Sequence, residues 1–203
     1  MNSKFNDRKY RHDKYYQKAK KENYLSRAVY KLMEIDKKHK LLNKDVFVLD
    51  LGCAPGSWSQ YILKKLSSPG KLVAIDLKKI NFPESSNFEF YQQDFYEFDF
   101  QKLLQEEGRK FDLVVSDMAP DTIGNNFTDC VRSAALVQYI LHLAPDILVH
   151  NGNMAAKIFQ GVDFDETLKA ARKAFRKVKV LKPKGSRKES KEVYFVCLGF
   201  RQE

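Results

Sequence analysis

Residues 46–58 read VFVLDLGCAPGSW, a stretch that joins an apolar run, a glycine turn and the start of a helix. The apolar run over 46–51 predicts a buried parallel strand, and residues 52–56 predict a tight turn. The helix predicted after the turn covers 58–66, with Ser57 as its N-cap. Strand, glycine turn and helix in this order are typical of a nucleotide-binding unit in a doubly wound α/β sheet.

The spacing inside this unit narrows the kind of ligand. Dinucleotide-binding folds use G-x-G-x-x-G, which brings backbone N–H groups close to a pyrophosphate. Here the spacing is Asp50-x-Gly52-x-x-x-Gly56 with Pro55 inside the turn, so a carboxylate lies at the strand end. Such a carboxylate repels a pyrophosphate but suits an amino group or a sulfonium. The turn therefore favours S-adenosylmethionine, which carries no phosphate; the alternative is a turn that binds no ligand.

Length and composition indicate the class of protein. The 203 residues can bury a sizeable core, and we expect 1–203 to form a single domain. No apolar run approaches the roughly 18 residues of a membrane span, and no secretory signal is visible, so we expect a cytoplasmic protein without membrane contact. Three cysteines lie far apart (Cys53, Cys130 and Cys197), and the four histidines show no metal-ligand spacing. We therefore expect buried free thiols and no metal.

The net charge of +10 is unevenly distributed. Residues 1–44 hold 14 Lys and Arg against 5 Asp and Glu, residues 169–191 hold 11 against 1, and the remainder holds 11 against 20. Such segregation favours a polyanion, and the basic segments lack the apolar stripe of an interfacial helix. We expect a nucleic acid partner, with residues 1–22 as a basic, flexible segment. Tyrosines among these basic residues either stack on bases or pack on the domain.

Strand and helix patterns alternate along the rest of the chain. A helix is predicted over 26–36, with Ser26 as its N-cap. Further strands are predicted over 71–76, 88–94, 111–115, 153–159, 178–181 and 192–200, and further helices over 130–148 and 165–175. Pro145 ends or kinks the first of these two helices. The alternation predicts an α/β fold with a largely parallel sheet.

Four aspartates lie at predicted strand ends: Asp50, Asp76, Asp94 and Asp117. In open α/β sheets ligands bind at the carboxyl ends of the strands, and neighbouring carboxylates repel one another unless a ligand uses them. Asp76 has the spacing of a ribose ligand, and Asp94 either accepts from an adenine amino group or caps the next helix. The first three are thus candidate cofactor residues, and Asp117 is better placed to face a second substrate.

Lys157 lies inside an otherwise apolar predicted strand. Burying an ammonium costs several kcal/mol unless it is paired, so this lysine is a candidate functional residue. Lys31, in the helix predicted over 26–36, is either part of the same site or an ordinary surface lysine.

Five motifs together resemble one known family. They are SRAVYKL (26–32), VLDLGCAPGSWSQY (48–61), VVSDMAP (114–120), MAAKIF (154–159) and SRKESKEVYFVCLGF (186–200). In order and spacing they resemble the FtsJ/RrmJ ribosomal RNA 2′-O-ribose methyltransferases, from about Tyr15 to the C-terminus. The resemblance implies a Rossmann-like, S-adenosylmethionine-dependent methyltransferase fold. Its sheet would be mostly parallel, with seven strands in the order 3-2-1-4-5-7-6, the last strand antiparallel and helices on both faces.

The resemblance also implies the site residues. The family's Lys-Asp-Lys-Glu tetrad falls on Lys31, Asp117, Lys157 and Glu192. The family's cofactor positions fall on Gly56, Trp58, Asp76, Asp94 and again Asp117, to which the turn itself adds Asp50, Gly52 and Pro55. Cys53 and Ser57 stand where many members have Ser and Gly, and both replacements are small enough to keep the turn.

A ribose hydroxyl is a poor nucleophile, so methyl transfer to it needs a nearby base and a methyl group held in line. We expect Lys157 to be the base, oriented by Asp117, with Lys31 and Glu192 positioning the ribose. A 2′-hydroxyl restricts the substrate to RNA. The compact length favours a uridine of large-subunit ribosomal RNA in an assembled particle, acted on by a monomer; transfer RNA or mitochondrial ribosomal RNA is the alternative substrate.

Two functions of other classes remain open from the residues alone. A methyltransferase for a small molecule or a protein would share the glycine turn but would not need two basic flanks. A non-catalytic RNA-binding module would need the basic flanks but not four strand-end aspartates or a lysine in an apolar strand.

Overall fold

Seven strands form one sheet in the computed structural model, which describes residues 13–82, 85–187 and 189–202. The strands are β1 (Phe47–Leu51), β2 (Lys71–Asp76), β3 (Phe88–Gln92), β4 (Phe111–Ser116), β5 (Leu148–Phe159), β6 (Phe175–Leu181) and β7 (Glu192–Phe200). Their order is β3-β2-β1-β4-β5-β7-β6, and β7 is antiparallel to both β5 and β6. The other adjacent pairs are parallel. The predicted strand order and the predicted antiparallel last strand are confirmed.

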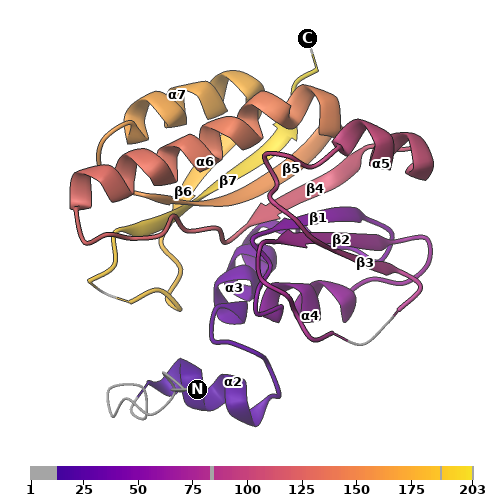
Figure 1. Cartoon of the computed structure of the whole chain (residues 1–203), viewed down its shortest axis with the longest axis horizontal. Helices are drawn as coiled ribbons and strands as arrows, with labels where there is room; N and C mark the ends of the chain where they lie inside the picture. Colours follow the sequence, from indigo (N-terminus) through magenta and orange to yellow (C-terminus); the bar gives the residue numbers. More distant parts are fainter. Residues whose placement is uncertain (1–12, 83–84, 188, 203) are drawn as a thin grey trace.

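Helices cover both faces of this sheet. They are α2 (Lys14–Lys21), α3 (Val29–His39), α4 (Ser57–Leu63), α5 (Phe100–Glu107), α6 (Asn126–Ile147) and α7 (Phe164–Ala174). Figure 1 shows α5, α6 and α7 on one side of the sheet and α3 and α4 on the other, with α2 beyond α3. Two apolar cores fill the layers: one joins α5, α6 and α7 to the sheet, and the other joins α3 and α4 to it.

Central strands are buried on both faces, which explains their unbroken apolar runs. All five residues of β1 are buried, Asp50 included, and five of the six residues of β4 are buried. A parallel strand flanked by two helical layers faces apolar neighbours on either side. The three cysteines are buried free thiols, as predicted. Among the described residues, no helix is both long enough and apolar enough to cross a membrane.

Two predicted helix caps were wrong. The N-cap of α4 is Gly56, with φ +104°, and Ser57 is the first helical residue. The N-cap of α3 is Ala28, without a side-chain bond, so Ser26 lies outside that helix. The hydroxyls of Ser26 and Ser57 bond to each other at 2.8 Å, and Ser26 Oγ also accepts from the backbone N–H of Ala28 at 3.2 Å. Ser26 therefore bonds the turn that precedes α3 rather than the first turn of the helix itself.

The structure describes residues 13–22 of the basic N-terminal segment, and the flexibility expected for residues 1–22 stays a prediction. Residues 1–12 lie outside the described part of the chain, whereas 14–21 form α2. Asp13 caps this helix by accepting from the backbone N–H groups of Tyr15 and Tyr16. Tyr15 packs against Tyr30 of α3 at a ring distance of 5.5 Å. Of the two predicted roles for these tyrosines, packing on the domain holds for Tyr15.

Candidate active site

Four elements bring the four predicted tetrad residues together. Lys31 comes from the first turn of α3, Asp117 directly follows β4, Lys157 lies in β5 and Glu192 begins β7. Lys157 pairs with Tyr194 across the antiparallel β5–β7 ladder. Side chains two residues apart on a strand share a face, so Glu192 lies on the same face as Tyr194 and Lys157. Lys31, Asp117, Lys157 and Glu192 are called the four-residue cluster below.

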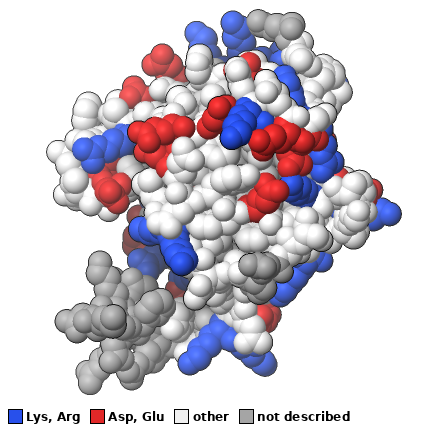
Figure 2. Space-filling view, turned by 45° about the vertical axis from the view of Figure 1, so that its right-hand side comes forward, with Lys and Arg blue, Asp and Glu red and all other residues white. Residues whose placement is uncertain are grey.

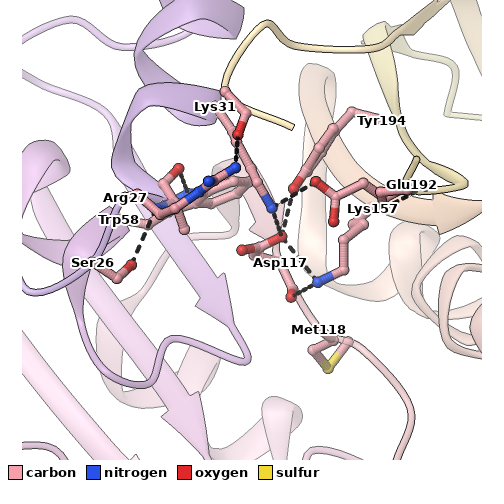
Figure 3. Close-up of polar contacts among 12 residues, drawn as sticks. Ser26, Arg27, Lys31, Trp58, Asp117, Met118, Lys157, Glu192 and Tyr194 are labelled. Carbon is pink, nitrogen blue, oxygen red and sulfur yellow. Dashed lines mark hydrogen bonds and ion pairs between the residues drawn. The ribbon is translucent and has the colours of Figure 1, made fainter. Parts of the chain in front are cut away.

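Distances within the four-residue cluster are those of ion pairs (Figure 3). Lys157 Nζ lies 3.0 Å from Asp117 Oδ1 and also donates to the backbone carbonyl of Asp117. Lys31 Nζ lies 2.8 Å from Glu192 Oε1 and 3.8 Å from Asp117 Oδ1. The arrangement aims both ammonium groups at the carboxylate of Asp117.

Asp117 is the electrostatic centre of this cluster. Burial by itself would raise the pKa of its carboxyl, but Lys157, Lys31 and the hydroxyl of Tyr194 outweigh burial and hold that pKa below its usual range. Its side chain is 18% exposed, against 7% for Lys157. Asp117 therefore stays ionised, and an ionised carboxylate fixes the direction of the amine that donates to it.

Tyr194 is a further member of the site, and the sequence analysis missed it. Its hydroxyl donates to Asp117 Oδ1 at 2.5 Å, and its ring lies under Lys31 Nζ at 5.8 Å. Burial and the neighbouring Asp117 raise the pKa of this phenol well above its usual value, so it remains a donor. The signal was present in the sequence, because Tyr194 lies two residues after Glu192 and so shares its face of β7.

A cavity of about 540 Å³ opens at the carboxyl ends of β1 to β4, and we call it the strand-end cavity. Its lining includes four of the predicted cofactor residues: Gly52, Asp76, Asp94 and Asp117. Asp76 joins this cavity to the glycine turn, because its Oδ2 accepts from Ala54 N and its Oδ1 from Lys78 N, both at 2.8 Å. Each carboxylate oxygen has a further lone pair for a ligand hydroxyl.

Asp94 is a cavity residue rather than a helix cap. Its Oδ1 accepts from the backbone N–H of Tyr96 at 3.0 Å, which forms a tight turn after β3. The N-cap of α5 is Asp99, whose side chain accepts from Lys102 N. Of the two roles predicted for Asp94, the cap is therefore excluded.

Four other predicted cofactor residues do not line the strand-end cavity. Asp50 is fully buried beneath the turn, where its Oδ2 accepts from Ser59 Oγ at 2.7 Å. Trp58 is 2% exposed, and its ring N–H donates to the carbonyl of Ala28 at 2.8 Å. Pro55 is exposed and Gly56 buried, and neither is among the lining residues. These four residues belong to the glycine turn and to the strand and helix that flank it, outside the lining of the strand-end cavity.

A second cavity, of about 720 Å³, lies on the other side of the four-residue cluster, and we call it the α3 cavity. Its walls are the start of α3 and the chain that leads into β7. The lining residues are Ser26, Arg27, Ala28, Lys31, Arg187, Glu189, Ser190 and Glu192. Three of these side chains are cationic and two, Glu189 and Glu192, are anionic, so the cavity offers both donors and acceptors to a polar ligand.

The four-residue cluster borders both cavities. Asp117 lines the strand-end cavity, whereas Lys31 and Glu192 line the α3 cavity. A ligand in one cavity would therefore face a ligand in the other across Asp117 and Lys31. Such a layout suits transfer of a group between two bound molecules.

The chain is similar to proteins of known family over most of its length. A family model described as FtsJ-like methyltransferase matches residues 24–200. A protein from Nitratidesulfovibrio vulgaris (strain DP4), named ribosomal RNA large subunit methyltransferase E, is 45% identical over 196 residues, which cover 96% of this chain and 95% of the relative. A protein of the same name from Methanothermobacter thermautotrophicus is 44% identical over 190 residues, covering 93% and 90%.

Solved structures agree with this similarity. A Plasmodium falciparum protein described as a ribosomal RNA methyltransferase superposes with a TM-score of 0.77 at 31% identity, covering 87% of this chain and 98% of that chain. A Lactococcus lactis protein described as a hemolysin shares the fold, with a TM-score of 0.65 and 18% identity over 89% of this chain and 90% of that chain.

Proposed function

The chain belongs to the FtsJ-like methyltransferase family, and from this premise we propose that it methylates a ribose 2′-hydroxyl of large-subunit ribosomal RNA with S-adenosylmethionine as the methyl donor. The target is a uridine in an assembled ribosomal particle in the cytoplasm. The enzyme is a monomer with one domain, and all members of the four-residue cluster come from one chain. The names of the relatives support ribosomal RNA as the substrate.

The observation that carries the proposal is that the four-residue cluster borders both cavities. The strand-end cavity would hold the methyl donor, and the α3 cavity would hold the acceptor nucleotide. In the α3 cavity, Arg27, Lys31 and Arg187 would donate to an RNA phosphate, and Glu189 and Glu192 would accept from ribose hydroxyls.

The residues of the strand-end cavity fit S-adenosylmethionine. Asp76 would accept hydrogen bonds from the ribose hydroxyls, and Asp94 from the adenine amino group. Asp117 would face the sulfonium end of the molecule. When bound, S-adenosylmethionine supplies an electrophilic methyl group on a positively charged sulfur. Carboxylates favour that cation, whereas they would repel the pyrophosphate of a dinucleotide.

The four-residue cluster would supply the base. Lys157 would act in its neutral form, after its ammonium has released a proton to solvent, and would accept the proton of the ribose O2′ as that oxygen takes the methyl group; the bound donor would supply the methyl group and retain the electron pair of the broken carbon–sulfur bond. Asp117 holds Lys157 Nζ at 3.0 Å and so fixes the direction of the amine. Lys31, paired with Glu192 at 2.8 Å, is placed to hold the ribose.

Methyl transfer to RNA with a labelled donor tests this proposal. The substrate is large ribosomal subunits from cells that lack this protein, compared with the same RNA stripped of protein and with transfer RNA. We expect label in a 2′-O-methylated uridine of the large-subunit RNA, and faster transfer to the particle than to naked RNA. Label on a base, or on transfer RNA alone, would contradict the proposal.

A further inference from the structure

Helix α2 is attached directly to the wall of the α3 cavity. Asp13, its N-cap, forms an ion pair with Arg27, which lines that cavity. Arg27 Nη2 also donates to the carbonyl of Gly185 at 2.7 Å. One guanidinium thus joins α2, the start of α3 and the loop before β7. The first turn of α2 is fixed at the rim of the cavity.

The inward face of α2 packs on α3. Ala19 is 2% exposed and belongs to a small apolar cluster with Val29 and Tyr30. Lys18 Nζ lies 4.6 Å from the centre of the Tyr30 ring. These contacts set the rotation of the helix about its own axis and so decide which residues face outward.

The outward face of α2 is positive. Lys14, Lys20 and Lys21 are exposed and make no ion pair with any residue that the structure describes. Both acidic residues of the segment are engaged: Asp13 with Arg27, and Glu22 with the hydroxyl of Tyr30 at 2.9 Å and Lys18 at 3.8 Å. On the face drawn in Figure 2, Asp and Glu gather mainly in the upper half, whereas Lys and Arg are spread from the top of the molecule to its lower end.

We propose that the RNA backbone runs from the α3 cavity along the lysine-bearing outward face of α2, and that the Asp13–Arg27 ion pair holds the helix in line with the cavity. This inference rests on the proposed function and adds the path of the RNA. Eight helical residues span about 12 Å, so α2 is long enough to meet a few successive phosphates of one strand. RNA is the occupant that the charge favours, because a row of lysines without an exposed apolar stripe suits a polyanion rather than a membrane.

Salt-dependent binding tests the path of the RNA. The triple variant Lys14→Gln/Lys20→Gln/Lys21→Gln keeps helix propensity and leaves the contacts of Lys18 intact. Its dissociation constant is measured with transcribed, unmodified large-subunit ribosomal RNA. We expect affinity near 0.1 M salt to fall about tenfold or more, and the slope of log affinity against log salt to flatten by about 2 to 3. Affinity for S-adenosylmethionine should not change.

A matched control lies on the other face of the sheet. Lys169, Arg172 and Lys173 are exposed on α7, and replacing all three by Gln removes the same charge. That variant should bind RNA with the wild-type salt slope. Equal losses in both variants would overturn the proposed path, since net charge alone would then explain them. An unchanged slope in the α2 variant would overturn it as well.

The variant Asp13→Asn tests whether RNA affinity depends on the position of α2 or only on the net charge of the protein. Asn caps helices as well as Asp does, so Oδ1 can still accept from Tyr15 and Tyr16, whereas the new amide group presents N–H to Arg27. The variant carries one more net positive charge, so simple electrostatics predicts tighter RNA binding. The proposal predicts weaker binding, because α2 is no longer held in line with the cavity; tighter binding would overturn the role of the ion pair.

The proposed function can fail separately from this inference. Wild-type protein that binds the RNA but transfers no methyl group would contradict the proposed function and leave the path of the RNA unaffected.

Discussion

Among single residues, Asp76 links the glycine turn to the strand-end cavity, because its two oxygens accept backbone N–H groups from Ala54 and Lys78. Asp76→Asn keeps one acceptor for the backbone but removes the charge that a ribose hydroxyl would use. We expect cofactor affinity to fall by about 1.5–3 kcal/mol with little change in folding. Asp76→Ala should also lower the free energy of unfolding by about 1–3 kcal/mol, because a backbone N–H of the turn loses its partner. Titration calorimetry and denaturation measure the two effects; a folded Asp76→Asn protein with wild-type affinity would exclude Asp76 as the ribose ligand.

Asp50 is the residue whose ionisation should make stability depend on pH. It is fully buried, and its Oδ1 has no hydrogen-bond partner among the residues that the structure describes. Burial raises the pKa of Asp50 to about 7; Ser59 lowers it, and Asp117 and Asp76 raise it further. The folded protein therefore holds this proton more tightly than the unfolded chain does. The stability that Asp50 contributes is present below about pH 4 and is lost as pH rises through about 7.

Comparison with Asp50→Asn isolates this effect, because the amide cannot titrate. Between pH 5 and pH 8 the free energy of unfolding of the wild type should fall relative to that of the variant, by about 2–3 kcal/mol. Urea denaturation of both proteins across this range measures the difference. Parallel pH curves for the two proteins would mean that Asp50 is ionised throughout and that the burial argument is wrong.

At the scale of elements, the glycine turn and the end of β4 fit together through Gly52. This residue has φ +70°, and a Cβ on it would lie 2.3 Å from Met118 Cγ, next to Asp117. Gly108, which follows α5, has φ +65° and open space around it. Gly108→Ala should therefore cost only the backbone strain, about 1 kcal/mol. Gly52→Ala should cost more and should also weaken cofactor binding, since Met118 must move. Equal costs for the two variants, with unchanged cofactor affinity, would show that this contact does not shape the site.

Element boundaries show which parts of the fold the sequence predicts. The strands over 71–76 and 192–200 have the predicted limits, because alternation or unbroken burial marks both ends. Strand β5 begins at Leu148, five residues before the predicted start. Asn151 and Gly152 lie within this strand, which continues through an irregularity in its pairing with β4 between Phe111 and Leu113. A bulge of this kind depends on the partner strand, which local sequence does not reveal.

The candidate site, like the element boundaries, was predicted only in part from the sequence. The resemblance identified the four-residue cluster, and the structure brings all four members into contact. Tyr194 was missed because a tyrosine in an apolar strand looks like an ordinary core residue until its partner is known. Trp58 stays a predicted cofactor residue; in the structure its ring N–H donates to the carbonyl of Ala28 and its side chain is buried. Hydrogen-bond partners between distant segments decide such cases, and they depend on packing.

At the scale of the whole molecule, the two basic segments predicted from the sequence do not lie on one face. The segment over 169–191 is divided: α7 covers the face of the sheet opposite to α3, whereas Arg27 of the α3 start contacts Gly185. The basic side chains that line the α3 cavity therefore come from the start of α3 (Arg27 and Lys31) and from the loop before β7 (Arg187). Sequence alone indicates how much positive charge there is, but the topology decides which of it reaches the cavity.

The central claim is that the four-residue cluster carries out methyl transfer with Lys157 as the base. Lys157→Arg tests it most directly, because guanidinium can still pair with Asp117 but stays protonated and cannot accept a proton. Single-turnover methyl transfer to large ribosomal subunits is measured for the wild type, Lys157→Arg and Lys157→Ala, with cofactor affinity and melting temperature as controls. We predict that both variants bind the cofactor and lose about 10²–10⁴-fold in rate. An active Lys157→Arg enzyme, with a lowered melting temperature in Lys157→Ala, would contradict the claim and leave Lys157 only a structural partner of Asp117.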